Sequence, residues 1–289
     1  DRSDRGDRGP RNDRGPRDNN NPRYQGQNNR NGQPGGQPGG PRNDRNDRND
    51  RAPRKDRDTK PAQPQRFEAK PPRKEKPMDP DSFKIYNSTA VVFSSRIEGE
   101  KIEADDYLNH KLLQKTLEEN LVEKPDDLFE AYIFAQREKL KFDNFFKAHS
   151  ILSKSLLPQE QQGRMRFGQK VISTQKDGKI TYEACQASDV PKEFRKLFED
   201  IDYLLKKDLS PEESFYFASY IHLVFVKIHP FDDGNGRSAR LLEKWFLARK
   251  LDLAVWSINS EKYYHDHLSE YYKNLEDVGF FYDDLDYGK

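Results

Sequence analysis

An almost continuous run of apolar side chains from Phe215 to Ile228 is the strongest pattern in the sequence. Its apolar members are Phe215, Phe217, Tyr220, Ile221, Leu223, Val224, Phe225, Val226 and Ile228. A helix that is apolar nearly all round is buried on all sides, so the run predicts a central buried helix. The preceding Ser210-Pro211-Glu212-Glu213 supplies an N-cap serine, a proline at the first helical position and a glutamate three residues after the cap. Pro230 ends the helix near His229.

The other periodicities predict a mainly α-helical fold with one small hairpin. Apolar residues recur with helical spacing over 102–122, in two segments of 128–155, over 190–204 and from Glu261 to Asn274. From Arg237 onward the inward-facing stripe consists of Leu241, Leu242, Trp245 and Phe246. Val171-Ile172, a Lys-Asp-Gly turn and Ile180-Thr-Tyr predict a β-hairpin within residues 166–182.

Residues 1 to about 80 differ in composition from the rest of the chain. They read DRSDRGDRGPRNDRGPRDNNNP, GQPGGQPGGP and RNDRNDRND in turn, and Tyr24 and Phe67 are their aromatic residues. Such a segment buries too little apolar surface to offset the entropy of ordering, so we expect a disordered, low-complexity tail and a globular domain over 81–289. An RNA-binding arginine-rich arm is the alternative. The alternation of arginine with aspartate and the scarcity of rings for base stacking argue against nucleic acid.

The composition of the whole chain narrows the choice of partners and compartment. The formal net charge of +1 over 289 residues gives no overall attraction to nucleic acid or to a membrane surface. No apolar run is long enough to span a bilayer. Cys185 is the single cysteine, so an intrachain disulfide is excluded and a reducing, cytoplasmic compartment is expected. The chain begins with Asp1 rather than methionine, which leaves open a processed product that has lost a targeting segment.

The segment from His229 to Arg240, HPFDDGNGRSAR, carries the candidate chemistry. A Gly-Asn-Gly turn that opens a helix directs backbone N–H groups and the helix dipole at one point, which makes an anion site. Arg237 and Arg240 lie one turn apart on the same face and suit the oxygens of one polyphosphate. Asp233 suits Mg²⁺, and His229 suits proton transfer near neutral pH. Taken singly, the histidine could be a core residue and DDGNG a polar turn; the spacing of the whole segment favours a nucleotide site.

This segment resembles the HPFx[D/E]GNGRxxR signature of the Fic (filamentation induced by cAMP) family at every defined position. The resemblance implies a Fic-type helical bundle and transfer of AMP from ATP, with Mg²⁺, to a Ser, Thr or Tyr hydroxyl of a target protein. It implies His229 as the general base, Asp233 as the Mg²⁺ ligand and Phe231 as a buried anchor of the loop. It further implies that Gly234, Asn235 and Gly236 cradle the phosphates, with Arg237 near the β-phosphate and Arg240 at the γ-phosphate.

The hairpin and a later tyrosine extend the resemblance. In the family the hairpin is a flap that docks the target backbone by strand addition, and Lys170, Val171, Ile172 and Ser173 would be its part nearest the nucleotide. Tyr263 aligns with a family tyrosine near the adenosine. The chain departs from the family at Tyr271, where many relatives have a nucleotide-binding asparagine, and in the flap, where it has Ser173-Thr174 in place of a glycine pair.

A second motif lies before the first, at Ser94 to Gly99, SSRIEG. It resembles the [S/T]xxxE[G/N] motif of the inhibitory helix in class II Fic proteins and places that helix at about residues 86–99. The resemblance implies autoinhibition, in which Glu98 pairs with Arg240 and removes the partner of the γ-phosphate. Such a charge-assisted contact is worth roughly 1.5–3 kcal/mol. The simpler interpretation is a surface glutamate followed by a helix-terminating glycine.

The sequence therefore favours an autoinhibited protein adenylyltransferase that also modifies itself. Three alternatives stay open: removal of AMP from a protein, with Glu98 orienting water; transfer of another phosphate-containing group, such as UMP or phosphocholine; and an inactive adaptor that binds partners through its tail and flap. A homodimer also stays open. The spacing of His265-Asp-His267 suggests a metal site, but zinc sites have three or four protein ligands and no third ligand lies nearby in the sequence, so the segment does not fit zinc.

Overall fold

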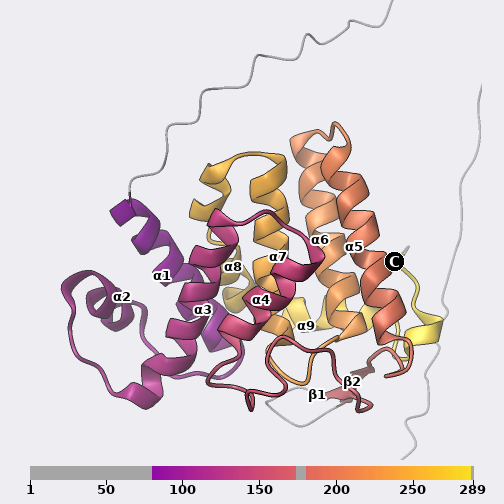
Figure 1. Ribbon diagram of the computed structural model, residues 1–289, viewed down its shortest axis with the longest axis horizontal. Coiled ribbons are helices and arrows are strands. Elements are labelled where there is room, and N and C mark those ends of the chain that lie inside the picture. Colours follow the sequence, from indigo (N-terminus) through magenta and orange to yellow (C-terminus); the bar gives the residue numbers. More distant parts are fainter. Residues whose placement is uncertain (1–79, 174–179, 288–289) are drawn as a thin grey trace, which may run out of the picture. The chain divides into compact units, whose positions relative to one another are not determined.

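The computed structural model describes residues 80–173 and 180–287, and it is mainly α-helical, which confirms the predicted fold class (Figure 1). The helices are α1 (Pro80–Ile97), α2 (Ala104–Leu113), α3 (Glu119–Arg137), α4 (Phe142–Leu152), α5 (Val190–Lys206), α6 (Pro211–Ile228), α7 (Asn235–Lys250), α8 (Ser260–Asp266) and α9 (Leu268–Asp277), with short 3₁₀ turns η1 (Leu253–Ser257) and η2 (Tyr282–Asp284). The predicted tail over 1–80, apart from its last residue, and the predicted Lys-Asp-Gly turn lie outside the described residues.

Helix α6 begins as predicted but is not buried on all sides. The Ser210 side chain accepts a hydrogen bond from the Glu213 backbone, and the Glu213 carboxylate accepts one from the Ser210 backbone, which completes a capping box. The prediction of burial all round is wrong for the part of the helix up to Tyr220, where Phe215 and Tyr220 are 42% and 36% exposed. These rings face solvent at the edge of the bundle, which the apolar character of the run does not reveal.

Helix α7 is the more completely buried element. Every residue from Arg237 to Ala248 is buried, and Figure 1 shows α7 in the middle of the bundle, between α3 and α4 on one side and α5 and α6 on the other. Its charged side chains are neutralised internally. Lys244 Nζ, for example, lies 2.6 Å from an Oε of Glu261, whose other oxygen accepts from the Tyr132 hydroxyl at 2.7 Å. A buried charge is costly unless it is paired. These partners therefore allow α7 to keep a polar sequence inside the core.

A cluster of phenylalanine rings supports the turn after α6. Phe145 of α4, Phe194 of α5 and Phe225 of α6 have their ring centroids 5.8–6.2 Å from that of Phe231. Phe231 itself is fully buried. The rings meet edge-on or tilted, the arrangements that aromatic pairs prefer. The turn that carries the candidate chemistry is thus fixed to three helices of the core.

Two other predictions met different outcomes. The single helix expected over 102–122 is wrong, because α2 ends at Leu113, Gln114 takes a positive φ of 55°, and α3 begins at Glu119. The hairpin is confirmed as an antiparallel pair, β1 (Val171–Ser173) and β2 (Ile180–Glu183), with a register shift between Ile172 and Ser173. Across residues 80–173 and 180–287, the helices are too short or too polar to cross a membrane.

Candidate active site

His229 forms the end of α6 and has an uncommon backbone conformation. It is the C-cap residue, with φ 52° and ψ 60°, and its N–H donates to the Phe225 carbonyl at 2.9 Å. Its Nδ1 lies 3.3 Å from the Val226 carbonyl oxygen. Because a carbonyl only accepts, this contact places the ring proton on Nδ1 and leaves the lone pair on Nε2. The imidazole therefore presents an acceptor nitrogen away from α6.

Burial lowers the pKa of His229 to about 4, and the positive charges of Arg166 and Lys170 act in the same direction. The Val226 carbonyl and the Glu98 carboxylate oppose this shift. A histidine with a lowered pKa is neutral at physiological pH, and the neutral ring is the form that takes up a proton. The electrostatics of the site thus keep the His229 ring in its neutral form at physiological pH.

The turn after His229 is held in place by hydrogen bonds between its own residues. The Asn235 amide accepts from the Phe231 N–H at 3.0 Å and donates to the Phe231 carbonyl at 2.8 Å. Asn235 is buried, so its amide closes the turn from inside. Gly234 has φ 77°, a conformation that favours glycine, and its N–H donates to the Asp233 carboxylate at 2.6 Å. These hydrogen bonds therefore hold the turn in its shape from within.

His149 is buried beneath this turn. Its Nδ1 lies 3.0 Å from the N–H of Gly163 and must accept, so its Nε2 donates to the Asp233 carbonyl at 3.0 Å. The ring stacks on Phe231 with centroids 3.6 Å apart. Burial lowers the pKa of His149 to about 4, which keeps it neutral in this role.

The carboxylate of Glu98 lies on the N-terminal turn of α7. A Cβ added at Gly236 would overlap the Glu98 carboxylate, so the glycine allows this close approach. The first N–H groups of a helix have no partner within the helix and attract anions. Glu98 follows the last turn of α1, and Gly99 directly after it has φ 89°. A side-chain carboxylate therefore occupies the anion site predicted for a phosphate.

Arg240 is the partner of Glu98. Its Nη2 lies 2.6 Å from Glu98 Oε1 and 3.0 Å from the Ser94 carbonyl, and its Nε donates to the Ser94 hydroxyl at 2.8 Å. Burial raises the pKa of Glu98, but Arg240 and Arg237 outweigh that effect and hold the pKa below its usual value. The predicted pairing of Glu98 with Arg240 is thus present in the structure, and Ser94 contributes two further contacts.

Arg237 is held by an acid that the sequence did not single out. Glu100 Oε1 lies 3.2 Å from Arg237 Nη2 and 2.8 Å from Lys124 Nζ. Glu100 lies two residues after Glu98, and this proximity was the signal available in the sequence. Both arginines of the predicted phosphate site therefore pair with carboxylates from one short segment after α1.

The hairpin lies next to the turn. Lys170 Nζ is 3.8 Å from Asp232 Oδ1, which brings the start of the hairpin to the candidate site. Val171 is exposed and Ile172 is half-buried, while Ser173 ends β1. On the other edge of the hairpin, the Glu183 N–H donates to the Phe280 carbonyl at 2.8 Å. The segment around Phe280 therefore covers part of the β2 edge.

Tyr263 lies on α8 and is 60% exposed. With His267 and Tyr271 it lines a cavity of about 300 Å³ between α6 and the α8–α9 helices. The Tyr271 hydroxyl lies 2.9 Å from His222 Nε2, and His222 Nδ1 lies 2.7 Å from the Glu243 carboxylate. Tyr271, where the family resemblance led us to expect an asparagine, thus lines the cavity with its hydroxyl held by His222.

The histidines of the His265-Asp-His267 segment pack against rings. His265 lies 5.3 Å from Phe93 between ring centroids, and His267 stacks on Tyr263 at 4.2 Å. Among the described residues, no group of three His, Cys, Asp or Glu side chains is close enough together to hold a metal ion. Asp233, predicted as a magnesium ligand, is exposed at the predicted phosphate site, which fits a Mg²⁺ ion that takes its other ligands from substrate and water.

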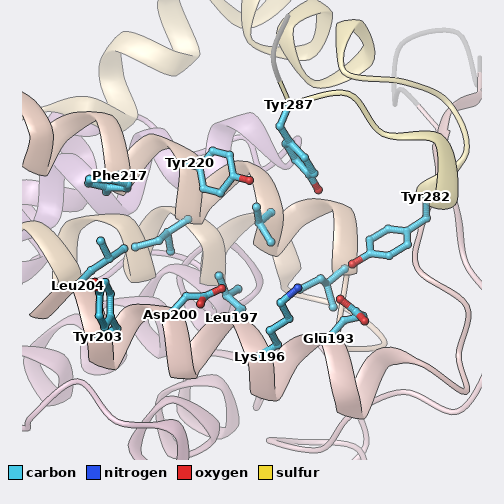
Figure 2. Close-up of a pocket in the computed structure, with 13 residues that line it drawn as sticks. Glu193, Lys196, Leu197, Asp200, Tyr203, Leu204, Phe217, Tyr220, Tyr282 and Tyr287 are labelled. Carbon is cyan, nitrogen blue, oxygen red and sulfur yellow. The ribbon is translucent and has the colours of Figure 1, made fainter.

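A second cavity, of about 330 Å³, lies between α5 and α6 (Figure 2). Tyr203, Tyr220, Tyr282 and Tyr287 line it together with Lys196. None of its lining residues is one of the predicted site residues. The two cavities are lined by different residues of the same stretch of α6.

The comparisons with known proteins agree with this fold. Residues 139–247 match the family model of the Fic/DOC family. A stretch of 48 residues is 50% identical to the "Protein adenylyltransferase Fic" of Nematostella vectensis, covering 17% of this chain and 11% of that protein. The fold is similar to that of a Fic family protein from Desulfovibrio desulfuricans G20, with a TM-score of 0.60 and 21% identity over 69% of this chain and 59% of that chain.

A second solved structure shares the fold. It is a Fic domain containing signaling protein from Bacteroides thetaiotaomicron VPI-5482, with a TM-score of 0.55 and 17% identity over 73% of this chain and 81% of that one. These identities show the fold alone, and the sequence match to the curated relative spans about a tenth of its length. The matched segment of the family model contains the hairpin, α6, the turn and most of α7, and residues 139–247 therefore form a Fic/DOC family domain.

Proposed function

We propose that the chain is a protein adenylyltransferase that is inhibited by its own Glu98. The observation that carries the proposal is the occupation of the α7 anion site by a carboxylate that also pairs with Arg240. A site that binds one anion at a helix N-terminus with an arginine beside it suits a phosphate group equally well. We assign residues 81–289 to the Fic domain, with an inhibitory helix, flap and active-site segment at about 86–99, 166–182 and 229–240.

In the proposed reaction, the phosphates of ATP lie on Gly234, Asn235 and Gly236, with Arg237 and Arg240 on the β- and γ-phosphates. Asp233 would hold Mg²⁺, which neutralises phosphate charge when bound. Val171, Ile172 and Ser173 with Lys170 would border the nucleotide from the flap, and Tyr263 would lie near the adenosine.

His229 takes the proton from a Ser, Thr or Tyr hydroxyl of the target protein. The hydroxyl oxygen forms a bond to the α-phosphorus, and the bond from that phosphorus to pyrophosphate breaks. General-base assistance is worth about 10²–10⁴-fold in rate, and positioning contributes the rest. The lowered pKa of His229 supports this role, because the ring is neutral before the hydroxyl arrives.

The test is labelling with ATP that carries ³²P on the α-phosphate, in the presence of Mg²⁺. Three proteins are compared: the full chain, Glu98→Gly, and Glu98→Gly with His229→Ala. We expect labelled protein with Glu98→Gly alone, because inhibition is removed and the base is intact. A label that persists in the double variant contradicts the base assignment, and equal labelling of the first two proteins contradicts inhibition by Glu98.

A further inference from the structure

Arg166 is a buried residue between α4 and β1 with an unusual set of partners. It is 2% exposed, and its guanidinium donates hydrogen bonds to four backbone carbonyls. The bonds are Nε to His229 O at 2.6 Å, Nη1 to Gly168 O at 2.6 Å, and Nη2 to Cys185 O at 2.5 Å and to Ile228 O at 3.2 Å. The Arg166 backbone N–H donates to Pro230 O at 2.9 Å.

These acceptors belong to two structures that have to meet in a reaction. Ile228, His229 and Pro230 form the turn that carries the proposed base. Gly168 precedes β1 and Cys185 follows β2, so they are the two ends of the hairpin. One guanidinium therefore joins the turn at His229 to both ends of the hairpin.

The backbone of His229 requires such support. A residue other than glycine with φ 52° and ψ 60° is in the left-handed region, which is costly for most side chains. Conformations of this kind persist when surrounding contacts fix them from several sides. Arg166 contacts the carbonyls of three consecutive residues through the turn, from Ile228 to Pro230.

We propose that Arg166 is a positioning residue, which fixes the left-handed turn at His229 and the hairpin in one geometry. The part that concerns catalysis rests on the proposed function, since it takes His229 as the base. The guanidinium is suited to the task because its five donors lie in one rigid plane and can reach carbonyls in different directions. A lysine ammonium would have to serve them from a single point.

The charge of Arg166 has a second effect on the same histidine. Burial lowers the pKa of the Arg166 guanidinium, with Cys185 and Asp232 opposing, but an arginine stays protonated in proteins. Its positive charge, together with that of Lys170, disfavours protonation of His229, and the Glu98 carboxylate opposes them. Two variants separate position from charge: Arg166→Lys keeps the charge and loses the planar donors, and Arg166→Met loses both.

The experiment compares Arg166→Lys and Arg166→Met in the full-length Glu98→Gly chain, with Arg164→Met as the control. Arg164 is an exposed arginine two residues away, so it matches the change in composition. Three quantities are measured: kcat and the KM for ATP in α-³²P labelling, amide hydrogen exchange of 168–173 and 183–185, and the NMR titration of the His229 ring. Thermal unfolding records whether each variant is folded.

We expect both Arg166 variants to exchange the hairpin amides faster and to lose roughly 10²-fold in kcat with a much smaller change in KM, since misplacement of a reacting group by about 1 Å costs that much. The His229 pKa should rise in Arg166→Met and less in Arg166→Lys. Arg164→Met should match its parent in all three quantities.

Wild-type exchange and kcat in folded Arg166→Lys would overturn the proposal. So would equal losses in Arg164→Met, because the effect would then be one of general charge. If no protein is labelled but the hairpin amides exchange faster in the Arg166 variants only, the positioning role is supported. That result would count against the proposed transfer of AMP and not against the positioning role. If Arg166→Met unfolds, the comparison of Arg166→Lys with Arg164→Met decides.

Discussion

Glu98 and Arg240 form an ion pair between positions 142 residues apart in the sequence, with Oε1 and Nη2 separated by 2.6 Å. The guanidinium side is 1% exposed and the carboxylate side 26%. Water screens such a pair less than one on the surface. The end of α1 is therefore fastened to α7 at the point where the proposed γ-phosphate partner lies.

We predict that Glu98→Gln raises the affinity for ATP. The change removes a negative charge from the phosphate site and weakens the hold on Arg240. A charge-assisted contact of roughly 1.5–3 kcal/mol corresponds to roughly a 10- to 100-fold lower Kd. Isothermal titration with ATP and Mg²⁺ measures it. Glu103→Gln is the control, since Glu103 is 69% exposed and pairs with Arg96; equal effects of the two substitutions would contradict the prediction.

Glu100→Gln should also tighten ATP binding, but by less. Glu100 divides its carboxylate between Arg237 and Lys124, at 3.2 and 2.8 Å. The contact to Arg237 is longer than the 2.6 Å contact between Glu98 and Arg240, and Lys124 shares the charge of Glu100, so we expect a gain below roughly tenfold in the same titration. Lys124→Met is the matched control, because it leaves the Glu100–Arg237 pair in place and should give no gain. A larger effect of Glu100 than of Glu98 would show that Arg237 is the main point of inhibition.

The sequence located much of the candidate site because its residues are neighbours in the chain. His229, Asp233 and Arg240 share one segment, and cap, turn and proline signals act over a few residues. The pairing of Glu98 with Arg240 came from the family resemblance and is present in the structure. Its inhibitory effect stays a prediction.

The parts that the sequence did not predict depend on contacts between distant segments. Arg166 bonds to carbonyls some 60 residues later in the chain, and carbonyls are invisible in a residue pattern. Helix α7 can be buried because acids such as Glu261 neutralise its charged side chains. Since its sequence is polar, the sequence pattern did not predict that α7 is the central helix. The break after α2 depends on one residue, Gln114, with a positive φ.

The rate of AMP transfer should not fall in the pH range where an ordinary histidine becomes protonated. Burial lowers the pKa of His229 to about 4 from an ordinary value of about 6.5. A base with a lowered pKa keeps its active neutral form as pH falls, until pH approaches that value. The Glu98→Gly variant lacks the carboxylate charge that raises the pKa of His229. The pH at which the rate declines is therefore not raised in this variant. The ratio kcat/KM for ATP reports the free enzyme, whose site carries no phosphate charge. Measured by labelling from pH 5.5 to 8, it should be nearly constant in its acid half; a decline centred near pH 6.5 would contradict the assignment.

The last prediction concerns the turn itself. Asn235→Ala removes both hydrogen bonds to the Phe231 backbone and leaves a buried N–H and a buried carbonyl without these partners. Each such group costs about 1–3 kcal/mol, and the loss should appear as a lower melting temperature in thermal unfolding. Asn235→Asp should not restore stability, because a carboxylate accepts from the Phe231 N–H but repels the carbonyl that the amide served. Asn144→Ala is the control: its amide donates to the Lys139 carbonyl at an exposed site, where the same deletion should cost a few tenths of a kcal/mol. If Asn144→Ala and Asn235→Ala have the same melting temperature, the turn is held by its phenylalanine packing and the Asn235 amide is dispensable.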